Sequence, residues 1–163
     1  MQGFEIWVES VYTEIVLYNK GDPMFKNILL AVDGSEHGLH AARMAGDLAR
    51  SLQAEDLYVV AAYEPIPPYI GDPYMQHAID ARLKESQVLL LKAVEAVGKI
   101  PGELHSELIE GSPAEAVIEV ARTRKSDVIV MGSRGLGRLA GALLGSTSQK
   151  VVSHAPCPVL IVR

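Results

Sequence analysis

A glycine-rich stretch near the C-terminal end constrains the fold of this chain more than any other feature. It follows residues 127–131, an apolar run typical of a buried parallel strand. Gly132, Gly135 and Gly145 come next, and three hydroxyl residues fill positions 146–148. Glycine lets a ligand approach the backbone closely, and the free N–H groups and dipole of a helix start favour an anion. The stretch therefore predicts an α/β fold that holds phosphate between a strand and a helix.

The distribution of charge also indicates an anionic ligand. The chain has a net charge of −5, yet residues 128–163 contain no Asp or Glu and carry Arg134, Arg138, Lys150 and Arg163. An anion bound by the glycine-rich stretch explains this separation better than chance does. The acidity of the whole chain argues against a general nucleic-acid binder and against a polybasic membrane anchor.

The remaining bulk features predict one cytoplasmic domain. A length of 163 residues is enough for a sizeable core, and no apolar run approaches the roughly 18 residues needed to span a bilayer. The N-terminus lacks the basic and apolar blocks of a secretory signal. One cysteine, Cys157, excludes an internal disulfide and suits a reducing compartment. It lies between two prolines, where we expect a packing role rather than a nucleophile.

Residues 1–23 differ in character from the rest of the chain. Apolar and polar residues alternate over 4–8 and 11–17, which is typical of a strand or hairpin, and residues 19–23 predict a turn or linker. Met24 then restarts the chain before a strand, as a natural initiator would. We expect an upstream extension or expression-derived segment without a functional role. The alternative is an extra strand at a sheet edge, in this chain or a partner, whose deletion would lower the melting temperature or change the oligomer.

The rest of the chain alternates strands with helices, which predicts a parallel sheet covered on both faces. Ser35 has the position of an N-cap, and Ser112 and Glu115 have the spacing of a capping box. A half-polar composition favours a position near a sheet edge for the third strand. The expected strands are 26–32, 56–62, 104–110, 127–131 and 159–162, and the expected helices are 36–52, 75–97, 113–124 and 145–154.

The glycine spacing resembles the nucleotide-binding pattern of the universal stress protein family. The pattern is Gly132-x-x-Gly135, nine further residues, and Gly145-Ser146. The resemblance covers residues 24–163 and leaves residues 1–23 outside. Four further landmarks of that family occur in the right order, namely Asp33-Gly34-Ser35, Gly111-Ser112-Pro113, residues 127–135 and residues 157–162.

The resemblance implies a Rossmann-like fold of the adenine-nucleotide alpha-hydrolase kind. Its single open five-stranded parallel sheet would have the order 3-2-1-4-5, with helices on both faces. Strands one and four would then be neighbours at the point where the chain reverses direction across the sheet, and ligands of such sheets bind in that crevice. The intact glycine pattern implies the branch that binds ATP with Mg²⁺. The family's homodimers imply pairing through the strand Val159 to Val162, which would cover an apolar edge.

Several expected site residues also have structural alternatives. Gly132 and Gly135 would shape the loop around phosphates, or else form an ordinary tight turn. Gly145 and Ser146 would present an N–H group and a hydroxyl, although a serine at this position can also be a simple helix cap. Arg134 would contact phosphate or be a solvated loop charge. The same two alternatives hold for Arg138.

The ends of the first two strands complete the expected site. The resemblance implies that Asp33 bonds ribose hydroxyls or holds water on Mg²⁺, whereas the alternative is a capping carboxylate for the first helix. Ala31 and Val32 would line the pocket floor, and the backbone near Ala62 would bond adenine. The hydroxyls at 147–148 would contact phosphate or face the sheet. The full expected set is Ala31, Val32, Asp33, Ala62, Met131, Gly132, Ser133, Arg134, Gly135, Gly145, Ser146, Thr147 and Ser148.

Other signatures in the chain argue against several alternative sites. No G-x-x-x-x-G-K-[ST] motif occurs, which excludes a P-loop NTPase. Residues 135–140 match G-x-G-x-x-A, but they follow the fourth strand and no acidic residue lies about 20 positions later. His37 and His40 are three apart, and no pair of histidines has the H-x-x-x-H spacing, so a structural metal is not expected.

The leading hypothesis is a dimeric, ATP-binding sensor or regulator of the stress response. Asp33 is the only carboxylate expected near the phosphates, so we expect at most weak ATPase activity. One alternative is a phosphohydrolase or nucleotidyl-transfer enzyme on the same fold. Another is a nucleotide-independent interaction module that uses the proline- and tyrosine-rich loop 63–74 or residues 1–23 as its contact surface.

Overall fold

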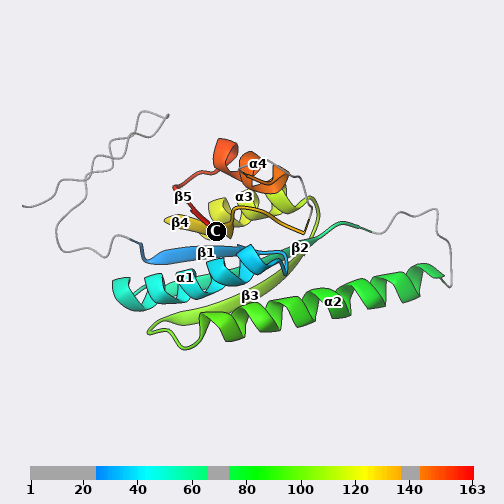
Figure 1. Ribbon diagram of the computed structural model, residues 1–163, viewed down its shortest axis with the longest axis horizontal. Helices are drawn as coiled ribbons and strands as arrows, with labels where there is room; N and C mark the ends of the chain where they lie inside the picture. Colours follow the sequence, from blue (N-terminus) through cyan, green and yellow to red (C-terminus); the bar gives the residue numbers. More distant parts are fainter. Residues whose placement is uncertain (1–24, 66–73, 137–143) are drawn as a thin grey trace, which may run out of the picture.

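Five strands form one sheet at the centre of the structure (Figure 1). The computed structural model describes residues 25–65, 74–136 and 144–163, so the predictions for residues 1–23, Arg138 and most of the 63–74 loop lie outside the described part. The strands are β1 (Asn27–Val32), β2 (Asp56–Tyr63), β3 (Glu103–Glu110), β4 (Val128–Gly132) and β5 (Val159–Val162). The helices are α1 (Glu36–Leu52), α2 (Tyr74–Val97), α3 (Pro113–Thr123) and α4 (Ser146–His154).

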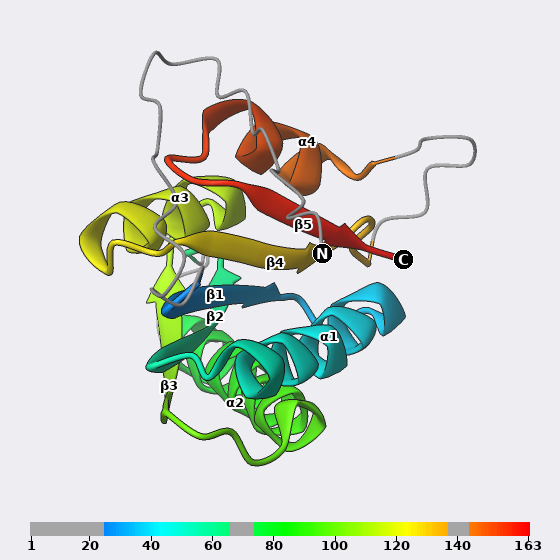
Figure 2. The same cartoon turned by 90° about the vertical axis from the view of Figure 1, so that its left-hand side faces the viewer.

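The sheet has the predicted order, β3-β2-β1-β4-β5, and every neighbouring pair is parallel. Helices α1 and α2 cover one face, and α3 and α4 cover the other (Figure 2). The chain therefore leaves β1 toward one face and leaves β4 toward the opposite face. A crevice opens between the carboxyl ends of these two central strands for that reason.

The apolar runs of the central strands reflect burial on both faces. In β1, Ile28 and Leu30 pack toward α1 and α2, whereas Leu29 packs toward α3 and α4, and all three are 0% exposed. Alternate residues of a strand point to opposite faces, so a strand covered on both sides is apolar throughout. On α1 the side that meets the sheet is made of small residues, Ala41, Ala42, Ala45 and Ala49, which permit close packing.

The two predicted helix caps have different outcomes. Ser35 caps α1, because its Oγ accepts a hydrogen bond from the N–H of Gly38 at 3.1 Å. The capping box predicted for α3 is wrong. Ser112 makes no side-chain cap bond, and Glu115 instead accepts a bond from Lys150 on α4 at 2.7 Å. Pro113 at the start of α3 has no N–H to satisfy, which reduces the need for a side-chain cap.

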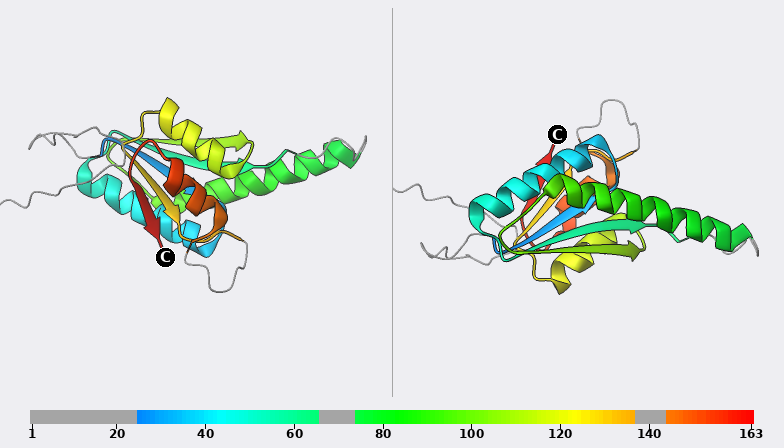
Figure 3. Two further views of the ribbon diagram at one scale, coloured as in Figure 1. Left: turned by 90° about the horizontal axis from the view of Figure 1, so that it is seen from above. Right: turned by 90° about the horizontal axis from the view of Figure 1, so that it is seen from below.

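Most predicted boundaries agree with the structure to within one residue. β3 is an edge strand, as its half-polar sequence indicates, and β5 forms the other edge. Figure 3 shows that the N-terminal part of α2 extends beyond the sheet, where Tyr74 is 72% exposed. Among the described helices, none is long and apolar enough to cross a membrane.

Candidate functional site

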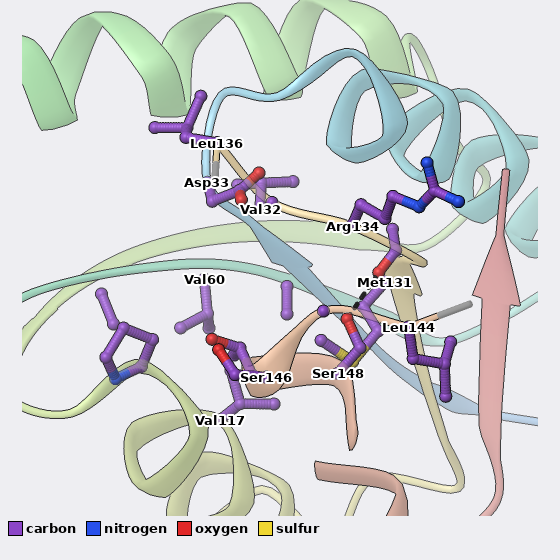
Figure 4. Close-up of a pocket in the computed structure, with 17 residues that line it drawn as sticks. Val32, Asp33, Val60, Val117, Met131, Arg134, Leu136, Leu144, Ser146 and Ser148 are labelled. Atoms are coloured by element: carbon purple, nitrogen blue, oxygen red, sulfur yellow. Dashed lines mark hydrogen bonds between the residues drawn. The ribbon is translucent and has the colours of Figure 1, made fainter. Parts of the chain in front are cut away.

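A cavity of about 240 Å³ lies at the carboxyl ends of β1, β2 and β4 (Figure 4). Twelve of the thirteen predicted site residues line it. The exception is Ser133, which is buried behind the loop with 1% of its surface exposed. The lining consists of Ala31, Val32, Asp33, Val60, Ala62, Pro113, Val117, Met131, Gly132, Arg134, Gly135, Leu136, Leu144, Gly145, Ser146, Thr147 and Ser148.

Asp33 follows β1 and has one oxygen fixed and the other directed at the glycine-rich loop. Its Oδ1 accepts hydrogen bonds from the backbone N–H of Ser35 at 3.0 Å and from the Ser35 hydroxyl at 2.6 Å. Its Oδ2 lies against Gly135, where an added Cβ would overlap it. The helix cap itself is Ser35. Ser35 therefore holds the carboxylate so that one oxygen remains available at the pocket.

The loop after β4 is tied to three neighbouring segments. The N–H of Ser133 donates to the carbonyl of Val162 on β5 at 2.7 Å, and the Ser133 carbonyl accepts from the N–H of Gly145 at 2.8 Å. The buried Ser133 hydroxyl lies 3.1 Å from Nδ1 of His37 on α1. These bonds hold the two ends of the loop together. Ser133 is therefore a structural residue of the site rather than part of its lining.

The described glycines of the cavity permit close approach and have no left-handed backbone. Positive φ values occur at Gly34, Gly98 and Gly111 among the described glycines, and none of the pocket glycines has one. A Cβ on Gly132 would lie within 2.8 Å of the backbone of His37, so packing requires glycine there. A Cβ on Gly145 would meet no described atom closer than 3.5 Å. Contacts with the described residues therefore do not require glycine at position 145.

The start of α4 lies at the cavity, and no described side chain caps it. Gly145 is the N-cap residue and offers no side chain, and the first turn of α4 contains no acidic residue. Ser146 is exposed at the mouth of the cavity and Thr147 is half-buried. Ser148 is buried and donates its hydroxyl to the Gly132 carbonyl at 2.9 Å, so it faces the sheet. An anion at this helix start would accept hydrogen bonds from the N–H groups of the first turn and from the hydroxyl of Ser146.

The cavity also has apolar walls that the sequence analysis missed. Val60 comes from β2, and Pro113 and Val117 come from the start of α3. The sequence could have identified these residues only in part. It predicts that Pro113 begins a helix, but it does not predict which strand end that helix start would face. Leu136 and Leu144 flank the loop and were also not predicted. The cavity thus combines an anion-favouring helix start with apolar walls, as a ligand with a flat apolar group and a phosphate requires.

The described lining contains few groups that could perform acid–base chemistry. Within this described set, Asp33 is the only carboxylate, Arg134 is the only basic side chain, and no histidine, cysteine or lysine occurs. Magnesium is commonly bound through one or two carboxylates together with the phosphates of its ligand. Oδ2 of Asp33, for which no hydrogen bond to a described residue is seen, fits the carboxylate of that donor set. The arrangement favours binding over catalysis.

The comparisons with known proteins agree on one family. The model of the universal stress protein family matches residues 24–163. A universal stress protein from Thermus aquaticus, encoded in the QAH/OAS sulfhydrylase 3′ region, is 48% identical over 140 residues, covering 86% of this chain and 100% of the relative.

Solved structures of the same family have the same fold. Universal stress protein UspA from Lactobacillus plantarum is 27% identical with a TM-score of 0.75, over 85% of this chain and 97% of that chain. A universal stress protein in complex with cAMP is 31% identical with a TM-score of 0.59, over 85% of this chain and 97% of that chain. The family match and the shared fold lead to one conclusion: this chain belongs to the universal stress protein family.

Proposed function

We propose that this protein binds an adenine nucleotide, ATP with Mg²⁺, in the cavity between β1, β2, β4 and the start of α4. The observation that carries the proposal is that a helix start without a side-chain cap, at Gly145, and apolar walls line the same cavity. The relative in complex with cAMP supports an adenine nucleotide as the ligand class. We further propose that the protein acts in the cytoplasm as a dimeric sensor or regulator of the stress response.

Different groups of the lining contact different parts of the nucleotide. The phosphates lie against the N–H groups of the first turn of α4 and the hydroxyl of Ser146, with Arg134 at the exposed rim. Adenine packs between Val60 and Val117, near the backbone of Ala62. The ribose and the Mg²⁺ with its bound water lie beside Asp33.

The affinity must come from many contacts together. One helix-start contact contributes about 0.3–1 kcal/mol when exposed, whereas micromolar binding requires about 8 kcal/mol. The free N–H groups, the hydroxyls, the magnesium ion and burial of the base are therefore all needed. Loss of any one contact should weaken binding without abolishing it.

Hydrolysis is expected to be slow at most. Asp33 is the only carboxylate in the described lining, and its Oδ1 is already occupied by two bonds from Ser35. A general base must reach the attacking water with a free acceptor. In this proposal the remaining oxygen serves Mg²⁺ or the ribose, which suits a protein that holds its nucleotide.

Calorimetric titration with Mg-ATP tests the proposal on protein freed of bound nucleotide. Ser146→Ala removes a hydroxyl at the cavity, and Ser153→Ala is its matched control, because Ser153 lies on the same helix and donates to Gln149 of that helix. We expect the first variant to raise the Kd by roughly 5- to 10-fold, a loss of about 1 kcal/mol. The control should bind like the unaltered protein.

Gly145→Val provides the stronger perturbation. A Cβ at this position fits the described packing, so the variant should fold, and its larger side chain should obstruct the phosphates. We expect binding to be lost while the circular dichroism spectrum is unchanged. Absence of Mg-ATP binding by the unaltered, nucleotide-free protein would refute the proposal. Titrations with AMP and cAMP would show whether the triphosphate is preferred.

The dimer proposed here would use the β5 edge. Among the described strands, β5 pairs with β4 on one side only, and Leu160 on this strand is 38% exposed. Leu160→Asp should convert the dimer to a monomer in light scattering, because a charge would enter the paired edge. Val88→Asp is the control, since Val88 is a similarly exposed residue on α2. A monomeric unaltered protein, or a dimer that survives Leu160→Asp, would contradict this use of β5.

A further inference from the structure

Three side chains that can ligate a metal converge at the amino ends of β2 and β3, at the opposite end of the strands from the nucleotide cavity. Asp56 pairs with Glu103 across the two parallel strands, and His105 follows Glu103 by two residues. Residues two apart on a strand share a face, so the register places all three on one side of the sheet. One ligand atom from each lies within 4.8 Å of the others.

The distances between these atoms suit a small divalent ion. Nε2 of His105 lies 2.7 Å from Oδ1 of Asp56 and 3.8 Å from Oε2 of Glu103. Tetrahedral zinc with bonds of about 2.0–2.2 Å separates its ligand atoms by roughly 3.3–3.6 Å. The Asp56–His105 contact would open by roughly 0.6–0.9 Å, and the Glu103–His105 contact would close by roughly 0.2–0.5 Å. Glu103 can make this adjustment readily, because 81% of its side chain is exposed.

The imidazole is already oriented by its neighbours. The ring of Tyr58 stacks on His105 with 4.5 Å between centroids and 15° between planes. The guanidinium of Arg124 lies 5.2 Å from the Tyr58 centroid and pairs with Glu107 at 2.7 Å. Fixing a ligand ring before the metal arrives lowers the entropy cost of binding. Because Arg124 pairs with Glu107, the positive charge of the guanidinium is neutralised beside the three candidate ligands.

We propose that Asp56, Glu103 and His105 bind a divalent transition-metal ion of the zinc class, with water completing the coordination. An imidazole with two carboxylates favours zinc, cobalt or nickel, whereas magnesium and calcium favour oxygen ligands alone. The ion would join the edge strand β3 to β2.

The proposal is separate from nucleotide binding and is tested without nucleotide. The full chain, treated with a chelator and dialysed, is titrated with Co²⁺ while visible absorption is recorded, and Zn²⁺ affinity is then measured by competition. His105→Gln removes the imidazole. His154→Gln is the matched control, since His154 lies exposed on α4 and its Nδ1 contacts the Lys150 carbonyl of its own helix. Asp56→Asn provides a second ligand variant in case the first does not fold.

We expect one metal ion per chain for the unaltered protein and for His154→Gln. The Kd should rise by at least roughly 100-fold in His105→Gln and in Asp56→Asn, because loss of even an outer partner of a ligand costs about 10- to 100-fold. Zinc should also raise the melting temperature of the unaltered protein and of the control. If Asp56 and His105 only form a hydrogen-bonded pair, no Co²⁺ or Zn²⁺ should bind at this site. That result, or binding that survives His105→Gln, would overturn the proposal.

Discussion

Replacing Gly135 by alanine should destabilise the folded protein only while a bulky side chain occupies position 33. A Cβ on Gly135 would overlap Oδ2 of Asp33, and no other described atom lies as close. Gly135 has no left-handed backbone, so alanine suits its φ. The Asp33 carboxylate must therefore move, and its movement strains two bonds from Ser35.

The magnitude follows from those two bonds. Hydrogen bonds to a charged group contribute about 1.5–3 kcal/mol, and partial exposure of Asp33 places the loss at about 1–2 kcal/mol. Replacing glycine by alanine at a compatible backbone returns about 0.4–1 kcal/mol by restricting the unfolded chain. Gly135→Ala alone should thus lower the free energy of unfolding by about 0–1.6 kcal/mol, with the midpoints of the two ranges giving roughly 0.8 kcal/mol. In an Asp33→Ala background the same change should be neutral or stabilising.

Urea denaturation of nucleotide-free protein measures this double-mutant cycle. We expect a coupling energy between positions 33 and 135 of about 1–2 kcal/mol, well above the roughly 0.3–0.5 kcal/mol scatter of independent sites. Asp33→Asn provides the steric control, because asparagine keeps the shape of aspartate without its charge, and Gly135→Ala should remain destabilising in that background. If Gly135→Ala cost the same free energy in the unaltered protein and in the Asp33→Ala variant, the reasoning would be refuted.

Three further predictions concern packing and reactivity. Gly46→Ala should lower the free energy of unfolding by about 1–3 kcal/mol in urea denaturation, despite the higher helix propensity of alanine, because its Cβ would overlap the Val97 carbonyl where α1 meets α2. Ser148→Ala should cost about 1–2 kcal/mol in the same assay, since it removes the hydroxyl that donates to the buried Gly132 carbonyl; an unchanged midpoint would contradict this. Burial, with a smaller contribution from Asp127, raises the pKa of the Cys157 thiol to about 11. Only roughly 0.1% of it is then thiolate at pH 8, so Ellman's reagent should modify the native protein far more slowly than the urea-unfolded chain.

The sequence by itself determined the elements of this fold and the position of its glycine-rich loop. Local signals suffice for these features, because an apolar run such as 127–131 and a cap such as Ser35 depend on neighbours within a few residues. The strand order came from the resemblance of the glycine spacing to a known family, since periodicity alone does not say which strands pair. The capping box at Ser112 failed because Lys150, distant in the sequence, engages Glu115 instead.

Only the tertiary structure decided which side chains meet. It placed Ser133 behind the loop against His37, which is 96 positions away, although the sequence offered Ser133 as a ligand contact. It brought the start of α3 to the wall of the cavity and set Asp56 beside His105 across two strands. These contacts depend on strand register and on helix position, and a shift of one residue would turn each side chain to the other face of the sheet. The chain's local pattern does not fix that register, which is determined by packing of the whole core.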